Sequence, residues 1–217
     1  MSETLEELQE AIRTFDEEGA EEKTRQALEE GIDPQKAIEA ATEVLRDIGD
    51  KFENGQLFLF DLVSAGDAMN ASREILEEEI TAAGGERESE GKVVLGTVEG
   101  DIHDIGKKIL AALLSANGYE VIDLGVEVPP EEFVETFEEI QADAVGASAM
   151  LTTTKEKQRE LVEVLEAEGV REDVIVMVGG APVTDEWLDE IGADIHGENA
   201  FDAVQKLNET KESAIAG

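Results

Sequence analysis

The sequence predicts an α/β protein in two parts, an N-terminal four-helix bundle and a doubly wound, five-stranded parallel sheet of the Rossmann-like or flavodoxin-like kind. Up to about residue 83, no apolar and polar residues alternate, and the helix-favouring residues Ala, Leu, Glu, Gln, Lys and Arg dominate. After residue 91, short β-branched runs alternate five times with helical segments. Such alternation is typical of a parallel sheet that helices cover on both faces.

Turn residues divide the first part into helices. Gly31 and Asp33-Pro34 end a first helical region, and the next helix is expected from Pro34 to the stop at Asn54-Gly55. A further helix is expected from about Leu57 to Ala82. Its apolar positions follow the spacing i, i+4, i+7, i+11, which predicts one buried face of a bundle. They are Phe58, Leu62, Ala65 and Met69.

The glycine-flanked, polar stretch at 84–91 shows no apolar periodicity and is expected to be a linker. We therefore predict a helical cap domain at 1–84, a linker at 85–91 and an α/β domain at 92–217. In the α/β domain, strands are expected at 92–98, 119–125, 143–149, 174–180 and 194–197. Helices are expected at 105–118, 129–141, 155–169, 185–192 and from 199 to about 211. Ligands of such sheets bind beyond the carboxyl ends of the strands, so the residues there are the candidates for function.

Charge and composition exclude several classes of function. The chain of 217 residues has 54 acidic and 17 basic residues, a net charge of −37. Both halves share the excess, which opposes binding to nucleic acids and to anionic membrane surfaces. With no cysteine, disulfides, thiolate metal sites and Cys nucleophiles are excluded. No signal peptide or membrane span is recognisable, so a cytoplasmic protein is expected.

The first predicted strand of the sheet leads into residues 96–106, which contain Asp101, His103 and Gly106. The segment is neither a dinucleotide-binding nor a P-loop motif. A histidine beyond a parallel sheet, with a carboxylate near one ring nitrogen, can coordinate a metal through the other. The alternative is a helix cap beside a surface histidine.

The segment Asp-Ile-His-Asp-Ile-Gly at 101–106 resembles the cobalamin-binding motif of methionine synthase and of corrinoid methyl carriers. Two further family landmarks follow at strand ends: Ser148-Ala149-Met150 in place of the family's SxL, and Gly179-Gly180. Residues 47–72 resemble the cap of corrinoid proteins that serve methylamine and methanol methyltransferases. The segment 148–154, SAMLTTT, is most similar to the methylamine type.

The resemblance implies a cobalamin or related corrinoid bound base-off/His-on. His103 would be the cobalt ligand, Asp101 would bond its other ring nitrogen, and the hydroxyl of Thr154 would extend this relay. Ser148 would contact the detached nucleotide base, Gly106 would let a helix approach the corrin, and Gly179 and Gly180 would leave a slot for the nucleotide tail. The implied cofactor-binding residues are Asp101, His103, Asp104, Ile105, Gly106, Ser148, Met150, Thr152, Gly179, Gly180 and Met69.

Some positions stay open within this resemblance. Met150 replaces the family's Leu, with a side chain of similar volume. His196 stands where relatives carry a small residue and an aromatic one, and is interpreted as an incidental loop residue rather than a contact to the nucleotide tail. The apolar face of the last cap helix is interpreted mainly as bundle core, and alternatively as a lid over the upper corrin face.

The implied function is that of a corrinoid protein that carries a methyl group on cobalt from a donor-specific methyltransferase to an acceptor methyltransferase of the coenzyme M or tetrahydrofolate type. A reductive activator is a further implied partner. The chain has no room for the barrel that would bind the donor, so it would be one component of an enzyme system, in one-carbon metabolism such as methanogenesis. A cobalamin-binding sensor without turnover and the cobalamin subunit of a mutase are the alternatives. The donor stays open among methylamines, methanol, a betaine and methoxy-aromatics, and the acidic composition favours a halophilic surface.

Overall fold

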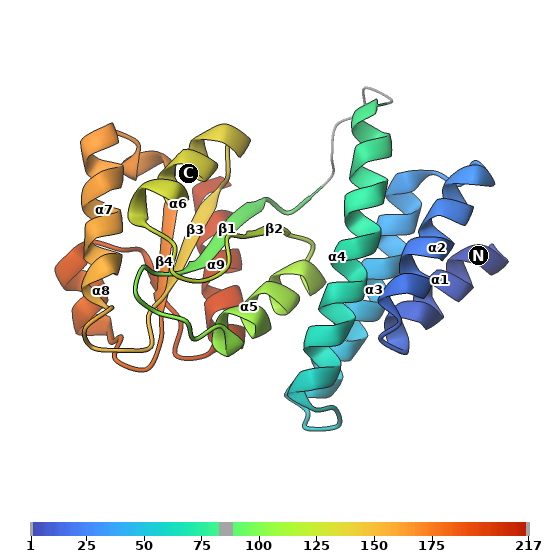
Figure 1. Cartoon of the computed structure of the whole chain (residues 1–217), viewed down its shortest axis with the longest axis horizontal. Helices are drawn as coiled ribbons and strands as arrows, with labels where there is room; N and C mark the ends of the chain where they lie inside the picture. Colours follow the sequence, from blue (N-terminus) through green and yellow to red (C-terminus); the bar gives the residue numbers. More distant parts are fainter. Residues whose placement is uncertain (1, 83–88, 216–217) are drawn as a thin grey trace. The chain divides into compact units, whose positions relative to one another are not determined.

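The computed structural model describes residues 2–82 and 89–215 (Figure 1). Its contacts divide the chain into two compact units. One unit comprises Met1–Glu90 and Ala112–Gly118, and the other comprises Gly91–Ala111 and Tyr119–Gly217. The predicted linker at 85–91 falls largely on residues 83–88, which lie outside the described ranges, so the predicted domain boundaries stay a prediction.

Four helices form the N-terminal part of the first unit and lie side by side in Figure 1, as the sequence predicts. Polar residues start the first three, because the side chains of Ser2, Asp16 and Asp33 accept hydrogen bonds from backbone N–H groups of the first turn. The helices are α1 (Glu3–Arg13), α2 (Glu17–Glu29), α3 (Pro34–Glu53) and α4 (Leu59–Ala82).

The predicted apolar face of α4 is confirmed at Leu62, Ala65 and Met69, which are fully buried. The prediction is wrong for Phe58, which precedes the helix and is 81% exposed. The backbone N–H of Phe58 donates to Oδ2 of Asp61 at 2.7 Å. Phe58 therefore caps the helix, which begins at Leu59. The side chain of Phe58 therefore does not lie on the helical face.

The second unit contains a parallel sheet with strand order β2-β1-β3-β4-β5, which confirms the predicted doubly wound fold. The strands are β1 (Lys92–Thr97), β2 (Glu120–Asp123), β3 (Ala144–Ser148), β4 (Ile175–Gly179) and β5 (Ile195–His196). Helix α5 (Ile105–Ala116) begins in the second unit, and its residues from Ala112 belong to the first. The other helices are α6 (Pro130–Ile140), α7 (Glu156–Glu168), α8 (Asp185–Ile191) and α9 (Ala200–Ile215), with a short 3-10 helix η1 (Arg171–Asp173) before β4.

The two faces of the sheet differ in what covers them. Val94, Val145 and Val176 are register partners on one face, where they belong to one apolar core with Phe133 of α6, Leu161 of α7 and Trp187 of α8. The next residues in register, Leu95, Gly146 and Met177, point to the opposite face. This second face borders a cavity beside α5 and α9.

The order of the strands places the point of reversal between β1 and β3. The last residues of these two strands, Thr97 and Ser148, are register partners, so the loops that follow them leave the sheet next to one another. One loop carries Asp101 and His103, and the other carries Met150 and Thr154. The fold thus brings together segments about 50 residues apart in the chain.

Candidate functional site

Local hydrogen bonds fix the loop that follows β1. The hydroxyl of Thr97 donates to the backbone oxygen of His103 at 3.0 Å. The backbone N–H of Asp101 donates to the backbone oxygen of Val98 at 3.1 Å, which closes a turn at Gly100. Gly100 has a φ of +79°, a conformation that glycine adopts without steric cost. The loop therefore holds Asp101 and His103 in one defined position.

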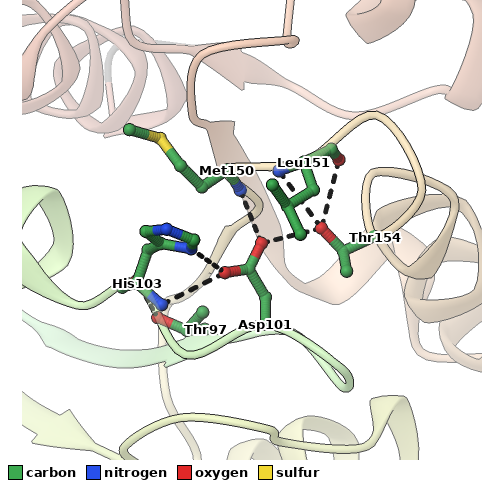
Figure 2. A network of polar contacts seen from close by, with 6 residues as sticks. All are labelled: Thr97, Asp101, His103, Met150, Leu151 and Thr154. Carbon is green, nitrogen blue, oxygen red and sulfur yellow. Dashed lines mark hydrogen bonds and ion pairs between the residues drawn. The ribbon is translucent and has the colours of Figure 1, made fainter.

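Asp101 lies at the centre of the polar network in Figure 2 and is 1% exposed. Its Oδ1 lies 2.7 Å from Nδ1 of His103 and accepts the backbone N–H of His103 at 3.1 Å. Its Oδ2 accepts the hydroxyl of Thr154 and the backbone N–H of Met150, each at 2.7 Å. The structure thus brings His103, Asp101 and Thr154 into direct contact.

Two opposing effects act on the pKa of Asp101. Burial alone would raise it, but the hydrogen bonds from Thr154, His103 and Met150 outweigh burial and hold the pKa well below its ordinary value. An ionised Asp101 accepts a hydrogen bond from the Nδ1–H group of His103, so Nε2 of a neutral ring keeps its lone pair. Because the side chain of His103 is 52% exposed, a metal can reach its Nε2.

A cavity of about 820 Å³ opens next to His103 and lies wholly within the second unit. It extends along the sheet face formed by Leu95, Gly146 and Met177, opposite residues of α5 and α9. The lining residues include eight of the implied cofactor-binding residues, namely His103, Asp104, Ile105, Gly106, Ser148, Met150, Gly179 and Gly180.

Three of the implied residues do not line the cavity. Asp101 contacts His103, a lining residue, but does not itself line the cavity. Thr152 is exposed and stands outside the cavity wall. Met69 belongs to the helical unit and is fully buried, as expected of a residue in the bundle core.

The three glycines of the motifs stand at their positions for different structural reasons. A Cβ at Gly180 would overlap the carbonyl oxygen of Ala149, and its φ is +124°, so the turn itself demands glycine there. A Cβ at Gly179 would meet only the backbone oxygen of Gly197, at 3.8 Å. A Cβ at Gly106 would meet no described atom within 4 Å, because Gly106 borders the cavity. Gly106 and Gly179 therefore leave room for a ligand, whereas Gly180 shapes the chain.

Sequence reasoning missed three features of the wall. Gly146 lies in the middle strand and borders the cavity, and a Cβ there would overlap Cδ2 of Leu95; a glycine inside a buried strand was the available signal. Lys107, 4% exposed, forms an ion pair with Asp123. His196, interpreted from sequence as an incidental loop residue, instead lies in β5, is buried, and borders the cavity.

The wall matches what a corrinoid requires of a protein. The cavity offers an exposed imidazole held by a buried carboxylate, and beside it a deep, mostly apolar slot with glycines where a large planar group would approach. Throughout the described ranges, no three His, Asp or Glu residues cluster as a metal site. No helix among residues 2–82 and 89–215 is long and apolar enough to cross a membrane.

Comparison with known proteins agrees with this geometry. Two models, each described as a B12 binding domain, match residues 91–205 and 4–77. Trimethylamine corrinoid protein 1 of Methanosarcina acetivorans is 46% identical over 198 residues, 91% of this chain and 92% of the relative. Dimethylamine corrinoid protein 2 of the same organism is 45% identical over 210 residues, 95% of each chain.

A solved structure is similar over the whole chain. The methanol:cobalamin methyltransferase complex MtaBC of Methanosarcina barkeri superposes with a TM-score of 0.82 at 30% identity, covering 100% of this chain and 81% of that one. The fold and the site define a protein with a B12-binding domain. The chain belongs to the family of corrinoid proteins with a helical and an α/β B12-binding domain, which confirms the resemblance seen in the sequence.

Proposed function

We propose that this protein binds cobalamin or a related corrinoid base-off/His-on and carries a methyl group between two methyltransferases. One observation carries the proposal: the exposed ring of His103, tied through Nδ1 to the buried, ionised Asp101, stands at the opening of the cavity. The bound corrinoid would supply a cobalt centre that accepts and releases a methyl group.

Asp101 and His103 would have separate roles, one holding a proton and the other binding cobalt. Nε2 of His103 is the nitrogen that would face cobalt, while Asp101 holds the proton on Nδ1. Thr154 donates its hydroxyl to the other carboxylate oxygen and keeps Asp101 ionised. A shift of the proton within this relay would change how strongly His103 donates to the metal, so Asp101 and Thr154 would tune the cofactor through His103.

The other implied residues have the following proposed roles. Asp104, Ile105, Gly106 and Met150 would border the corrin, and Ser148 and Gly179 would border its detached nucleotide tail, because all of them line the cavity. Direct contacts from Thr152 and Met69 stay proposals that rest on the resemblance alone. A lid of apolar cap residues over the upper corrin face likewise stays a proposal that rests on the resemblance alone.

The proposed partners are a donor-specific methyltransferase, an acceptor methyltransferase of the coenzyme M or tetrahydrofolate type, and a reductive activator. Relatives named for trimethylamine and dimethylamine support a methylamine donor, and a relative solved within a methyltransferase complex supports a partner chain. The protein would act as a component of this enzyme system, in the cytoplasm and in one-carbon metabolism such as methanogenesis. The sensor without turnover is not favoured, because these relatives are named as corrinoid proteins of methylamine and methanol systems.

The proposal is tested by electron paramagnetic resonance of the Co(II) form, prepared with protein labelled with ¹⁴N or ¹⁵N. We expect the hyperfine splitting from the axial nitrogen to change from a triplet to a doublet upon ¹⁵N labelling, because the nitrogen belongs to the protein. His103→Ala should abolish this splitting, and His196→Phe should retain it; these are the only two histidines of the chain. The proposal of base-off/His-on binding is contradicted if the splitting is the same in ¹⁴N- and ¹⁵N-labelled protein, or if it persists in His103→Ala.

A further inference from the structure

A buried amide joins the ends of two strands to the helices beside them. Gln158, in the first turn of α7, is fully buried. Its Nε2 donates to the backbone oxygen of Ala147 at 2.8 Å and to that of Gly179 at 3.1 Å. Its Oε1 accepts the indole N–H of Trp187 at 3.0 Å. One side chain of α7 thus connects β3, β4 and α8.

The partners of Gln158 require a donor and an acceptor on one side chain. The two carbonyl oxygens only accept, and the indole N–H only donates, so the NH₂ group of the amide must face the strands and its oxygen must face Trp187. A carboxylate would place a charge against two carbonyl oxygens, and an apolar side chain would remove the acceptor of a buried N–H group. The amide therefore fixes the start of α7 at one place on the sheet, which apolar packing alone does not specify.

The same stretch of chain carries Thr154, whose hydroxyl donates to Asp101. The backbone N–H groups of Thr154, Lys157 and Gln158 each donate to the oxygen three residues earlier, at 3.0 to 3.1 Å. Thr154 and Gln158 are thus about one turn apart in a continuous hydrogen-bonded segment, and both are buried. Because Gln158 is bonded to the strand ends, it sets the place from which the Thr154 hydroxyl reaches Oδ2 of Asp101 at 2.7 Å.

A second contact holds the same turn at the surface. Nζ of Lys157 lies 2.9 Å from Oε2 of Glu99, on the loop that carries Asp101, and the two side chains are 30% and 52% exposed. Lys157 also pairs with Glu160 at 2.6 Å. Exposed ion pairs of this kind contribute little to stability, because water and salt screen them. The buried amide of Gln158 is therefore the stronger attachment of the two.

We propose that Gln158 is a positioning residue for the relay of Thr154, Asp101 and His103, and that Trp187 holds its amide in the required orientation. Gln158 does not line the cavity and acts through Thr154. The consequence for methyl transfer rests on the proposed function, whereas the effect on Asp101 is a property of the protein without corrinoid. Removing the amide should therefore act on Asp101 as removing the Thr154 hydroxyl does.

The experiment follows the carboxyl carbon of Asp101 by nuclear magnetic resonance of ¹³C-labelled protein without corrinoid, and Asp101→Asn identifies its signal. Thr154→Val should shift this signal, since it removes one donor to Oδ2. Gln158→Met, a change of similar shape that removes the amide, should shift it in the same direction, and the double variant should shift it no further than Thr154→Val. Trp187→Phe should shift it less, because the two bonds of Gln158 to the strands remain.

Two controls separate positioning from a general loosening of the fold. Leu165→Ala, at a buried position farther along α7, should lower the midpoint of thermal unfolding at least as much as Gln158→Met without moving the Asp101 signal. Gln205→Met, the same change at an exposed position of α9, should alter neither.

The assignment is overturned if the Asp101 signal does not move in Gln158→Met, or if its shift adds in full to that of Thr154→Val. If Gln158→Met does not fold, Trp187→Phe decides in its place, and an unmoved signal there has the same meaning.

Methyl transfer by the loaded protein gives a second readout. Gln158→Met should slow single-turnover transfer about 10-fold, the lower end of the effect of changing a residue that acts through a metal-bound histidine. The double variant with Thr154→Val should be no slower than Thr154→Val alone, and a wild-type rate in Gln158→Met would contradict the proposal. If wild-type protein binds no corrinoid, the proposed function fails, whereas the Asp101 signal still tests the role of Gln158.

Discussion

Asp101 is the residue on which the whole site depends. One carboxylate joins the ring of His103, the hydroxyl of Thr154 and the backbone of Met150, and it is almost inaccessible to solvent. A buried charge persists only when hydrogen bonds compensate for lost hydration, and here four donors do so. The arrangement is therefore specific for a carboxylate, and the isosteric amide is the sharpest probe of it.

The first prediction concerns Asp101→Asn. The amide keeps the shape of the side chain but removes the charge that stabilises a proton on His103. We expect corrinoid binding to persist and methyl transfer to slow by roughly 10- to 100-fold, the usual effect of changing the partner of a metal-bound histidine. Single-turnover transfer from methylated protein, followed by the absorbance of the corrinoid, measures it.

Asp173→Asn, at an exposed position of η1, is the matched control and should transfer at the wild-type rate. A wild-type rate in Asp101→Asn would contradict the relay, since the charge would then have no part in tuning His103.

The second prediction is a dependence of stability on pH. The pKa of Asp101 is lower in the folded protein than in the unfolded chain, so the stability that its ionised form provides is fully present above the unfolded value of about 3.9. It is lost as the pH falls from there toward the folded value. The difference in unfolding free energy between wild type and Asp101→Asn, from urea denaturation, should shrink between pH 7 and pH 3. A constant difference over that range would show that the carboxylate titrates normally.

At the scale of elements, a glycine of one strand and a glycine of one helix border the cavity, for different physical reasons. Gly146 in β3 and Gly106 in α5 line the same cavity, and the helix starts only after the loop has placed His103. A Cβ at Gly106 would enter open space, whereas a Cβ at Gly146 would overlap Cδ2 of Leu95. The glycine of the helix therefore leaves room for a ligand, and the glycine of the strand leaves room for a neighbouring side chain of the sheet.

The third prediction tests Gly106→Ala. A Cβ there meets no described atom within 4 Å, and alanine favours the helix, so stability should be unchanged or rise by up to about 1 kcal/mol. The methyl group would occupy ligand space, so corrinoid affinity should fall by roughly 10-fold. Thermal unfolding of the apo form and corrinoid titration measure the two effects. Loss of stability together with affinity would instead indicate a packing role for Gly106.

At the scale of the whole molecule, charge dominates. If every one of the 17 basic residues neutralised one carboxylate, the net charge of −37 would remain. Several basic side chains are already in ion pairs, such as Arg159 with Glu156 and Glu190. The remaining carboxylates repel one another across the surface, which weakens the compact state until salt screens them.

The fourth prediction follows from this surplus. The Debye length falls from about 10 Å at 0.1 M salt to about 3 Å at 1 M, so most surface repulsion should vanish at molar KCl. We expect the midpoint of thermal unfolding of the apo protein to rise by more than about 5 °C between 0.1 M and 2 M KCl. NaCl should act alike, because screening depends on charge rather than on the ion. A midpoint that moves by only a few degrees would indicate an ordinary acidic surface and not a halophilic one.

The sequence by itself determined the elements and their order, because helix propensity, strand patterning and turn residues act over short stretches of chain. It also placed the cobalamin motif, since Asp101, His103 and Gly106 lie within six residues. It failed at Phe58 and at His196, where spacing and a short loop-like segment do not reveal whether a side chain points inward.

Only the tertiary structure decided which distant residues meet. Thr154 reaches Asp101 across 53 residues because β1 and β3 are neighbours in the sheet. Gly146 borders the cavity because it is in register with Leu95 and Met177. His196 contacts the carboxylate of Asp185 because α8 packs against β5. Such contacts depend on the strand order and on the face that each residue presents, and these are properties of the packed sheet rather than of any local segment.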